Sequence, residues 1–382
     1  MSKKKLTFVV SHLVPTYGLE RVVVNVVELL REHFDVRIVQ LSGEEVPPEL
    51  SPVVSVLSVG QPLRGWQRMG VLRRLQSRIP DDTTDVYIIA GVWVAIPWLL
   101  AASPRQRKRS IIWEHSILRE RLRHSSKMSL LAVSAFALYR RAAGVVAVSS
   151  PVADCFRKLP RPLRPQRIWE VANPVHESPN VPGSDTRATR NKPPYRLVSV
   201  GSLSKLKAQH LAVQSLVQLG PEYTLILIGD GVERQNLERL AEAEGVRDQV
   251  TFKGYLTQKE VRDELLNADL MVHCSVSETF GLVFAEAANL SLPVVATSNS
   301  VAELMIPRLV PGRTSPSERF ALARAIKEEI AAEVDYEKNL ASRKARATSL
   351  SPASVTAEWR RILDNFKEAK SILAVDTIQD NQ

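Results

Sequence analysis

Two glutamates eight residues apart, Glu278 and Glu286, mark the segment of the chain best suited to chemistry. An apolar strand pattern over 270–274 precedes them, and a helical pattern over 282–290 follows. Glu278 is therefore expected in a loop at the carboxyl end of a strand, and Glu286 on the helix that this loop opens. The first N–H groups of such a helix suit a phosphate, and a carboxylate further along can accept hydrogen bonds from sugar hydroxyls. The segment predicts a site for a sugar nucleotide.

A pair of carboxylates is also what a glycosidase needs, with an acid and a nucleophile on either side of the scissile bond. Here one carboxylate is expected at the helix start and the other about two turns in, so they would contact different parts of one ligand. Two plainer roles remain open: Glu278 could cap the helix, with or without ligand contact, and Glu286 could be an ordinary exposed helix residue.

The composition is that of a globular protein long enough for two domains. The chain has 382 residues, 45% of them hydrophobic and 24% charged. Its longest apolar runs, 92–102 and 130–138, fall short of the roughly 20 residues that span a bilayer. The N-terminus lacks a signal-peptide pattern, and two cysteines, Cys155 and Cys274, do not suggest a disulfide framework or a metal cluster. These features favour a cytoplasmic protein.

The net charge of +10 is concentrated in the first half. Residues 1–175 hold 26 Lys/Arg against 14 Asp/Glu, whereas residues 176–382 hold 25 against 27. This excess is either a solvated basic surface or a face toward an anionic partner. Nucleic acid is not expected, because no nucleic-acid-binding motif accompanies the charge. An anionic membrane leaflet or a lipid phosphate fits better. The basic clusters lie at 64–78, 105–109, 119–127 and 157–167.

Strand and helix patterns alternate along the chain, which is typical of parallel sheets with crossover helices. We expect an α/β protein of two doubly wound domains, 1–175 and 195–351, joined by a linker at 176–194. A final helix, 352–373, would pack back across both domains, before a disordered polar tail at 374–382. A cleft between the strand carboxyl ends would then hold the ligand. The strand patterns lie at 6–11, 36–41, 86–90, 110–113, 144–148, 197–200, 223–228, 250–252, 270–274 and 293–296.

These elements carry motifs that resemble the retaining glycosyltransferases of family 4, which belong to the group 1 glycosyl transferases and have the GT-B fold of two Rossmann-like domains. The resemblance covers nearly the full length and is strongest over 195–296. In the second half, the matching stretches are Ser275 with the two glutamates and Phe280-Gly-Leu282, the strand at 293–297, the donor-diphosphate loop at 200–207, and 228–231 and 252–254, which lie beside the nucleotide base in the family. In the first half, they are 18–25, Glu114-His115, and the two closing strands of that domain, 145–149 and 171–174.

The resemblance implies a role for each matched residue. Glu286 would bind the ribose hydroxyls, Glu278 would contact the transferred sugar or stabilise positive charge at its anomeric carbon, and Lys207 would neutralise the diphosphate. His115 would contact the donor sugar or its phosphate, unless it is simply a buried histidine. The expected catalytic residues are thus Glu278, His115 and Lys207, and the expected donor-binding residues are Glu286, Gly18, Gly201, Ser202, Lys205, Phe280, Gly281, Leu282 and Val283.

Two departures from the family pattern affect the donor site. Ser202 stands where the family usually has Arg, which removes one guanidinium from a site for roughly two negative charges. Lys205 is the candidate to replace it. Tyr17-Gly18 stands where a Gly-Gly pair is common, and Gly18 either allows close backbone approach or is only a turn glycine. His12, His210 and His273 lack partners at metal-ligand spacing, so no metal is expected.

The first hypothesis is a retaining glycosyltransferase of polysaccharide, glycolipid or cell-envelope biosynthesis. It would move a sugar from a nucleoside-diphosphate sugar, expected to be a UDP-sugar, to a hydroxyl of a lipid-linked or saccharide acceptor, with no other cofactor. It would be cytoplasmic and peripheral on the membrane. Ser202 and the weak match to the family after Thr297 motivate a second hypothesis, a catalytically weak homologue acting as a sugar-nucleotide-binding or scaffold subunit. A third, a sugar-nucleotide epimerase, lacks a clear acid/base set.

Overall fold

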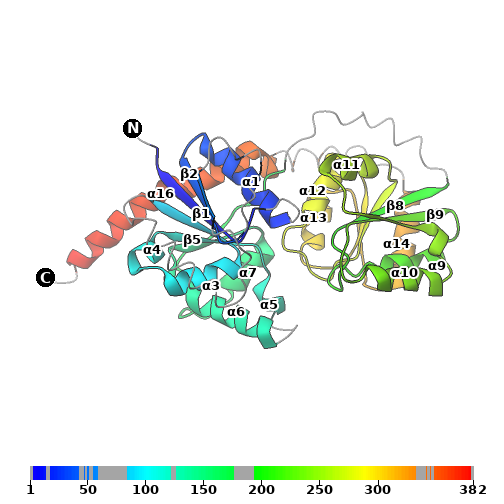
Figure 1. The fold of residues 1–382 in the computed structure, drawn as a ribbon, viewed down its shortest axis with the longest axis horizontal. Helices are drawn as coiled ribbons and strands as arrows, with labels where there is room; N and C mark the ends of the chain where they lie inside the picture. The colour runs from blue at the N-terminus through cyan, green and yellow to red at the C-terminus, as the bar shows by residue number, and fades with distance from the viewer. Residues whose placement is uncertain are drawn as a thin grey trace. The chain divides into compact units, whose positions relative to one another are not determined.

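A computed structural model describes residues 3–13, 18–42, 47, 50, 55–58, 84–121, 126–175, 193–332, 341, 345 and 348–379. Residues 176–192 of the predicted linker (176–194), the basic cluster at 64–78, Tyr17 and the last three residues of the tail lie outside these ranges. The chain divides into two compact units: Met1–Pro174 with Pro352–Gln382, and Val175–Ser351 (Figure 1).

The first unit is built on a parallel sheet of seven strands in the order β3-β2-β1-β4-β5-β6-β7. The order reverses beside β1, so a switch point lies between the carboxyl ends of β1 and β4. The strands are β1 (Lys5–Val10), β2 (Asp35–Gln40), β3 (Ser55–Ser58), β4 (Val86–Ala90), β5 (Ser110–Glu114), β6 (Gly144–Ala147) and β7 (Ile168–Glu170).

Helices connect these strands, as parallel pairing requires. The first, α1, buries a valine stripe at Val22, Val23, Val26 and Val27, the i, i+4 spacing of a helix face on a core. The helices are α1 (Gly18–Arg31), α3 (Val92–Ala101), α4 (Pro104–Lys108), α5 (Leu118–Arg121), α6 (Ser126–Leu138), α7 (Ser150–Arg157), the 3₁₀ turn η1 (Tyr139–Arg141) and α16 (Pro352–Gln379).

The long helix α16, last in the chain, belongs to the first unit and packs against α1, the first helix of the chain (Figure 1). Trp359 of α16 meets Trp113 of β5 edge to face, with ring centroids 5.3 Å apart. Trp113 in turn packs on Phe8 of β1. An aromatic chain thus joins this helix to the central strands.

The second unit has a parallel sheet of six strands in the order β10-β9-β8-β11-β12-β13. The chain moves outward from β8 and then returns to the other side, so the switch point lies between β8 and β11. The strands are β8 (Tyr195–Val200), β9 (Tyr223–Ile228), β10 (Val250–Gly254), β11 (Leu270–His273), β12 (Val294–Thr297) and β13 (Gly312–Ser315). The helices are α9 (His210–Leu219), α10 (Arg234–Ala243), α11 (Gln258–Leu266), α12 (Leu282–Asn289), α13 (Ala302–Leu309), α14 (Arg319–Ala331) and the 3₁₀ turn η2 (Arg247–Gln249).

The α/β class and the two doubly wound sheets were predicted correctly, but some elements differ. The closing strand of the first unit is Ile168–Glu170, before the 171–174 stretch expected to form it. Helix α16 runs to Gln379, beyond the predicted end at 373, because no Gly or Pro stops it there. Strand β13 was missed because its sequence, Gly-Arg-Thr-Ser, has no apolar alternation. Among the described residues, no helix is long and apolar enough to cross a membrane.

Trp359 provides a test of how α16 is held. Its side chain is 1% exposed, and replacing a buried aromatic by alanine costs about 3–5 kcal/mol. We expect Trp359→Ala to lower the urea midpoint of unfolding accordingly, whereas Trp93→Ala, whose side chain is 50% exposed, should change it little. Equal midpoints for the two variants would contradict this packing.

Candidate active site

The predicted site lies at the switch point of the second sheet, at the carboxyl ends of β8 and β11. After β8, residues 201–209 form one loop; after β11, residues 274–281 form another that leads into α12. The two loops are joined by backbone, because the carbonyl of Leu206 accepts a hydrogen bond from the N–H of Val276 at 2.9 Å. Strand topology therefore brings together two stretches about 70 residues apart in the chain.

The carboxylate of Glu278 is the centre of this site. Its Oε1 accepts a hydrogen bond from Nε2 of His273 at 2.7 Å and is also ion-paired with Nζ of Lys207. The three side chains are only 10%, 3% and 22% exposed, respectively. The other oxygen, Oε2, has no hydrogen-bond donor among the described residues. Glu278 is thus held at one oxygen and open at the other.

These contacts determine the charge of Glu278. Burial by itself raises the pKa of the carboxyl, but the hydrogen bond from His273 and the charge of Lys207 outweigh burial and lower the pKa to about 2. Glu278 is therefore an anion at neutral pH, and the Nε2 atom of His273 must carry the proton that the two share. A carboxyl ionised to this extent cannot serve as the proton donor of a glycosidase.

The start of α12 requires a glycine. Gly281, the residue before the helix, has φ of 71°, in the left-handed region. A Cβ there would also lie 2.4 Å from the ring of Phe284. Because Gly281 occupies the N-cap position and no side chain caps the helix, the capping role considered for Glu278 is wrong.

The first turn of α12 presents the N–H groups expected to meet a phosphate. Leu282 and Val283 are half-buried and open the helix, while Phe280 before them is buried. Glu286 is half-buried and lies four residues beyond Leu282 and three beyond Val283, so its side chain is a neighbour of both on the helix surface. The spacing therefore places the Glu286 carboxylate one turn behind the helix start.

Glycines in the neighbouring turn hold the loop after β8 in place. A Cβ at Gly229 would lie 2.2 Å from the carbonyl oxygen of Gly201, and one at Gly231 would lie 2.3 Å from that of Leu203. The N–H of Gly201 donates to the carbonyl of Ile228, the last residue of β9, at 2.9 Å, and the N–H of Leu203 donates to the carbonyl of Asp230 at 3.0 Å. The Gly229-Asp-Gly231 turn thus packs against the loop.

The loop after β8 places Lys207 against Glu278, but its other predicted donor-binding side chains, Ser202 and Lys205, do not reach Glu278. The side chain of Lys207 passes beside Gly201, its Cε 3.6 Å from where a Cβ of that glycine would lie. Gly201 has φ of 147°, a conformation that disfavours any side chain. Ser202 and Lys205 are exposed and take no part in the Glu278 network.

In the first unit, His115 follows β5, as predicted. Its ring lies on Trp113 with centroids 4.6 Å apart, and its buried Nε2 atom has no hydrogen-bond partner in the described part of the chain. Burial lowers the pKa of His115 to about 3, so the imidazole is neutral. Gly18 is exposed at the first position of α1.

Glu114 fixes the turn that carries His115. This carboxylate is fully buried and accepts hydrogen bonds from the Tyr139 hydroxyl at 2.6 Å and from the N–H groups of His115 and Ser116 at 2.9 and 2.8 Å. Sequence reasoning missed the roles of Glu114 and His273. The hydroxyl partner of Glu114, Tyr139, lies 25 residues away, and His273 reaches Glu278 only across the turn that follows β11, so neither contact follows from sequence spacing.

Two models of known protein families match this chain. The model "Glycosyltransferase Family 4" matches residues 16–178, and the model "Glycosyl transferases group 1" matches residues 184–346. With the two-sheet fold, these matches define a GT-B glycosyltransferase. The chain belongs to the group 1, family 4 glycosyltransferases, which confirms the resemblance seen in the sequence, and it is an enzyme of that type.

Individual relatives are distant. A 2-deoxystreptamine glucosyltransferase of Streptomyces kanamyceticus is 23% identical over 76% of this chain and 78% of its own length. The lipopolysaccharide core biosynthesis glycosyltransferase LpsE of Rhizobium meliloti is 36% identical over 26% of this chain and 29% of its own. The chain thus matches less than a third of LpsE.

Solved structures share the fold. HepE of Anabaena, in complex with UDP and glucose, has a TM-score of 0.75 at 20% identity, covering 94% of this chain and 99% of HepE. Sucrose-phosphate synthase of Thermosynechococcus elongatus has a TM-score of 0.79 at 18% identity, covering 96% and 100%.

The lowered pKa of Glu278 predicts a pH dependence of stability. Its folded-state pKa of about 2 lies below the ordinary value of 4.5, so it contributes stability above pH 4.5 that is lost as the pH falls toward 2. We expect the free energy of unfolding to fall more steeply over this window in the wild type than in Glu278→Gln. The matched control is Glu242→Gln, at an exposed helix position. Parallel curves of unfolding free energy against pH for Glu278→Gln and the wild type would contradict the lowered pKa of Glu278.

Proposed function

We propose that this glycosyltransferase moves a sugar from a UDP-sugar to an acceptor hydroxyl with retention of configuration at the anomeric carbon. The observation that carries the proposal is the ionised Glu278 held between Lys207 and His273 beside the start of α12. This arrangement offers positive groups for a diphosphate next to a negative group for an electron-poor sugar carbon. The complexes of HepE with UDP and with UDP-glucose support the choice of base.

In the proposed reaction the protein acts by position and charge. The bond from the anomeric carbon to the diphosphate oxygen breaks, and the acceptor oxygen forms the new bond on the same face of the sugar. The departing diphosphate takes the acceptor proton. Lys207 and the first N–H groups of α12 stabilise the negative charge that develops on the leaving diphosphate. Because these groups carry that charge, we propose that no metal is required.

Glu278 suits an electrostatic role better than a basic one. A carboxylate with a pKa of about 2 is a poor acceptor for a hydroxyl proton, but its negative charge persists throughout the physiological range. With Oε1 held by two donors, Oε2 remains for the sugar. We therefore assign Glu278 to contact with the transferred sugar and to stabilisation of positive charge at its anomeric carbon.

The remaining donor contacts are assigned on position. Glu286 would accept hydrogen bonds from the ribose hydroxyls one turn behind the phosphate. His115, neutral and with an unpartnered Nε2, would exchange a hydrogen bond with the donor sugar or its phosphate. Lys205, exposed on the diphosphate loop, would supply the cation that Ser202 does not. Gly18 would leave room for the ligand at the start of α1.

For the acceptor we propose a lipid-linked or saccharide hydroxyl compound of glycoconjugate biosynthesis, used by a cytoplasmic enzyme that is peripheral on the membrane. The basic excess of the first half supports this. Two relatives matched over part of their length carry names of this kind: LpsE, of lipopolysaccharide core biosynthesis, and the phosphatidylinositol N-acetylglucosaminyltransferase GPI3 subunit of yeast, matched over 31% of its length. The 2-deoxystreptamine glucosyltransferase, by contrast, is named for a small-molecule acceptor.

The donor site is tested by calorimetry and turnover with a panel of UDP-sugars. We expect Glu286→Ala to abolish transfer through lost donor binding, and Lys207→Ala to lower kcat about 10²- to 10³-fold, the usual effect of removing a group that stabilises developing charge. Lys259→Ala, at an exposed lysine of α11, is the matched control. Normal turnover of Glu286→Ala with a soluble acceptor would refute the assignment. Absence of UDP binding by the wild type would favour a scaffold role.

His273 is a positioning residue, and its variants separate charge from shape. His273→Phe keeps a planar ring but removes the donor to Glu278, so the pKa of Glu278 should rise, and the acid limb of the pH–rate profile should move to higher pH with a loss of kcat of about tenfold or more. His273→Gln retains an N–H donor, so it should restore part of kcat and move the acid limb part of the way back toward that of the wild type. The KM for donor should change little. Identical profiles for the two variants would indicate that His273 only fills space.

A further inference from the structure

The basic charge of the first unit has a particular place in the fold. Residues 104–112, 139–148 and 159–168, which comprise the segments before β5, β6 and β7 together with part or all of those strands, hold nine Lys/Arg and no Asp/Glu, and all nine cations precede the strands. Because the three strands are parallel neighbours, their starts lie along one edge of the sheet. The nine are Arg105, Arg107, Lys108, Arg109, Arg140, Arg141, Arg161, Arg164 and Arg167.

Backbone hydrogen bonds tie these segments to one another. The N–H of Ala143 bonds to the carbonyl of Ser110 at 2.8 Å, and the N–H of Val145 bonds to that of Arg167 at 2.9 Å. Arg140 also donates from Nη1 to the carbonyl of Pro162 at 2.8 Å. We call the surface formed by the nine cations the amino-edge face. It lies opposite the carboxyl edge that carries His115, so its charge does not serve that edge.

Most of this charge is not neutralised locally. Seven of the nine cations, all except Arg105 and Arg109, form no ion pair with an acidic residue of the described part of the chain. Uncompensated like charges on one face raise the potential there and attract an extended anionic partner.

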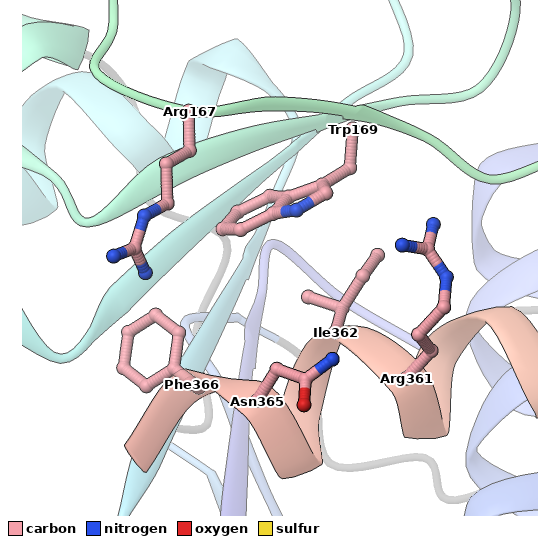
Figure 2. A pocket seen from close by; sticks show the side chains of 6 residues that line it. All are labelled: Arg167, Trp169, Arg361, Ile362, Asn365 and Phe366. Atoms are coloured by element: carbon pink, nitrogen blue, oxygen red, sulfur yellow. The ribbon is translucent and has the colours of Figure 1, made fainter. Parts of the chain in front are cut away.

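A pocket of about 200 Å³ opens beside this face, between β7 and α16. Arg167 and Trp169 come from the β7 segment on one side, and Ile362, Asn365 and Phe366 from α16 on the other (Figure 2). Trp169, Ile362 and Phe366 make it largely apolar. Arg167, Arg361 and Asn365 supply the polar groups, and Arg361 is paired with Glu358 at 2.7 Å.

The position of the indole depends on a glycine. A Cβ at Gly144, the first residue of β6, would lie 2.4 Å from the ring of Trp169. The bare backbone of β6 thus lets the half-buried indole lie against the sheet while its outer face lines the pocket (Figure 2). Amphipathic aromatic rings of this kind are favoured where an apolar region meets a polar one.

An apolar pocket with arginines beside it suits a molecule with an anionic head and an apolar remainder. A bilayer rich in anionic phospholipid offers such molecules in a plane, which also matches cations spread along a sheet edge. A nucleic acid strand would need a continuous groove with successive aromatic platforms for its bases, and a single discrete pocket fits it less well.

We propose that the amino-edge face docks on an anionic lipid bilayer and that the pocket between β7 and α16 receives an apolar part of one phospholipid, whose anionic headgroup lies at Arg167 and Arg361. The inference rests on the membrane contact proposed above and gives it a location. It is independent of the donor site, so binding can be measured without turnover.

The test is co-sedimentation of the full-length protein with vesicles of phosphatidylcholine alone, or of phosphatidylcholine mixed with phosphatidylglycerol. We expect binding only to the mixed vesicles, weakening as salt is added. Arg167→Ala/Arg361→Ala should lower the partition coefficient about fivefold for each cation removed. Trp169→Ala should lower it with the salt dependence unchanged, because it removes no charge. The matched control is Arg239→Ala/Arg324→Ala, which removes two exposed arginines from the second unit.

The outcomes are distinct. Unchanged vesicle binding by Arg167→Ala/Arg361→Ala, an equal loss in the control, or equal binding to neutral vesicles would overturn the inference. A single-stranded oligonucleotide that binds through Arg167 and Arg361 while mixed vesicles do not would also overturn it, in favour of nucleic acid. UDP calorimetry and transfer to a soluble acceptor should be normal in these variants. If the wild type binds vesicles but not UDP, the donor assignment fails and the docking inference stands.

Discussion

The candidate active site depends on one buried carboxylate shared by two donors. Glu278 would be costly to bury alone, and the hydrogen bond from His273 and the charge of Lys207 offset that cost. His273 belongs to β11, and Lys207 to the loop after β8. One cluster of charged side chains therefore holds both loops together at the switch point. Because α12 begins directly after the loop that carries Glu278, the cluster also fixes the position of the start of α12.

Backbone constraints then determine where those loops can lie. Gly201, Gly229 and Gly231 allow two turns to pack main chain against main chain, and Gly281 allows α12 to begin beside the ring of Phe284. In the first unit, the buried Glu114 has the corresponding task for the turn after β5. Both units thus use an ionisable group held by several donors to shape the end of a central strand.

The sequence predicted the α/β class, the two doubly wound sheets, and the family, because alternating patterns and the Glu278–Glu286 motif are local signals. It also placed Lys207 and Glu278 in one site through the family resemblance. It did not reveal that His273 bonds to Glu278, since an apolar strand pattern gives no indication of where a histidine ring points. Strand β13 was not predicted, because it is an edge strand and its sequence shows no apolar alternation. Ser202 and Lys205 lie exposed, and side-chain exposure on a loop is not encoded in spacing.

The contact between Lys207 and Glu278 has a consequence for ligand choice. Without a donor, the ammonium group already has a counter-ion, and an incoming ligand must compete with that internal anion for it. A single negative charge offers Lys207 no gain over the carboxylate it would leave, whereas a diphosphate offers more charge and several oxygens. If Lys207 binds the donor as proposed, the ion pair would set a threshold: it would favour nucleoside diphosphates over nucleosides and monoanions before any contact with base or sugar is made.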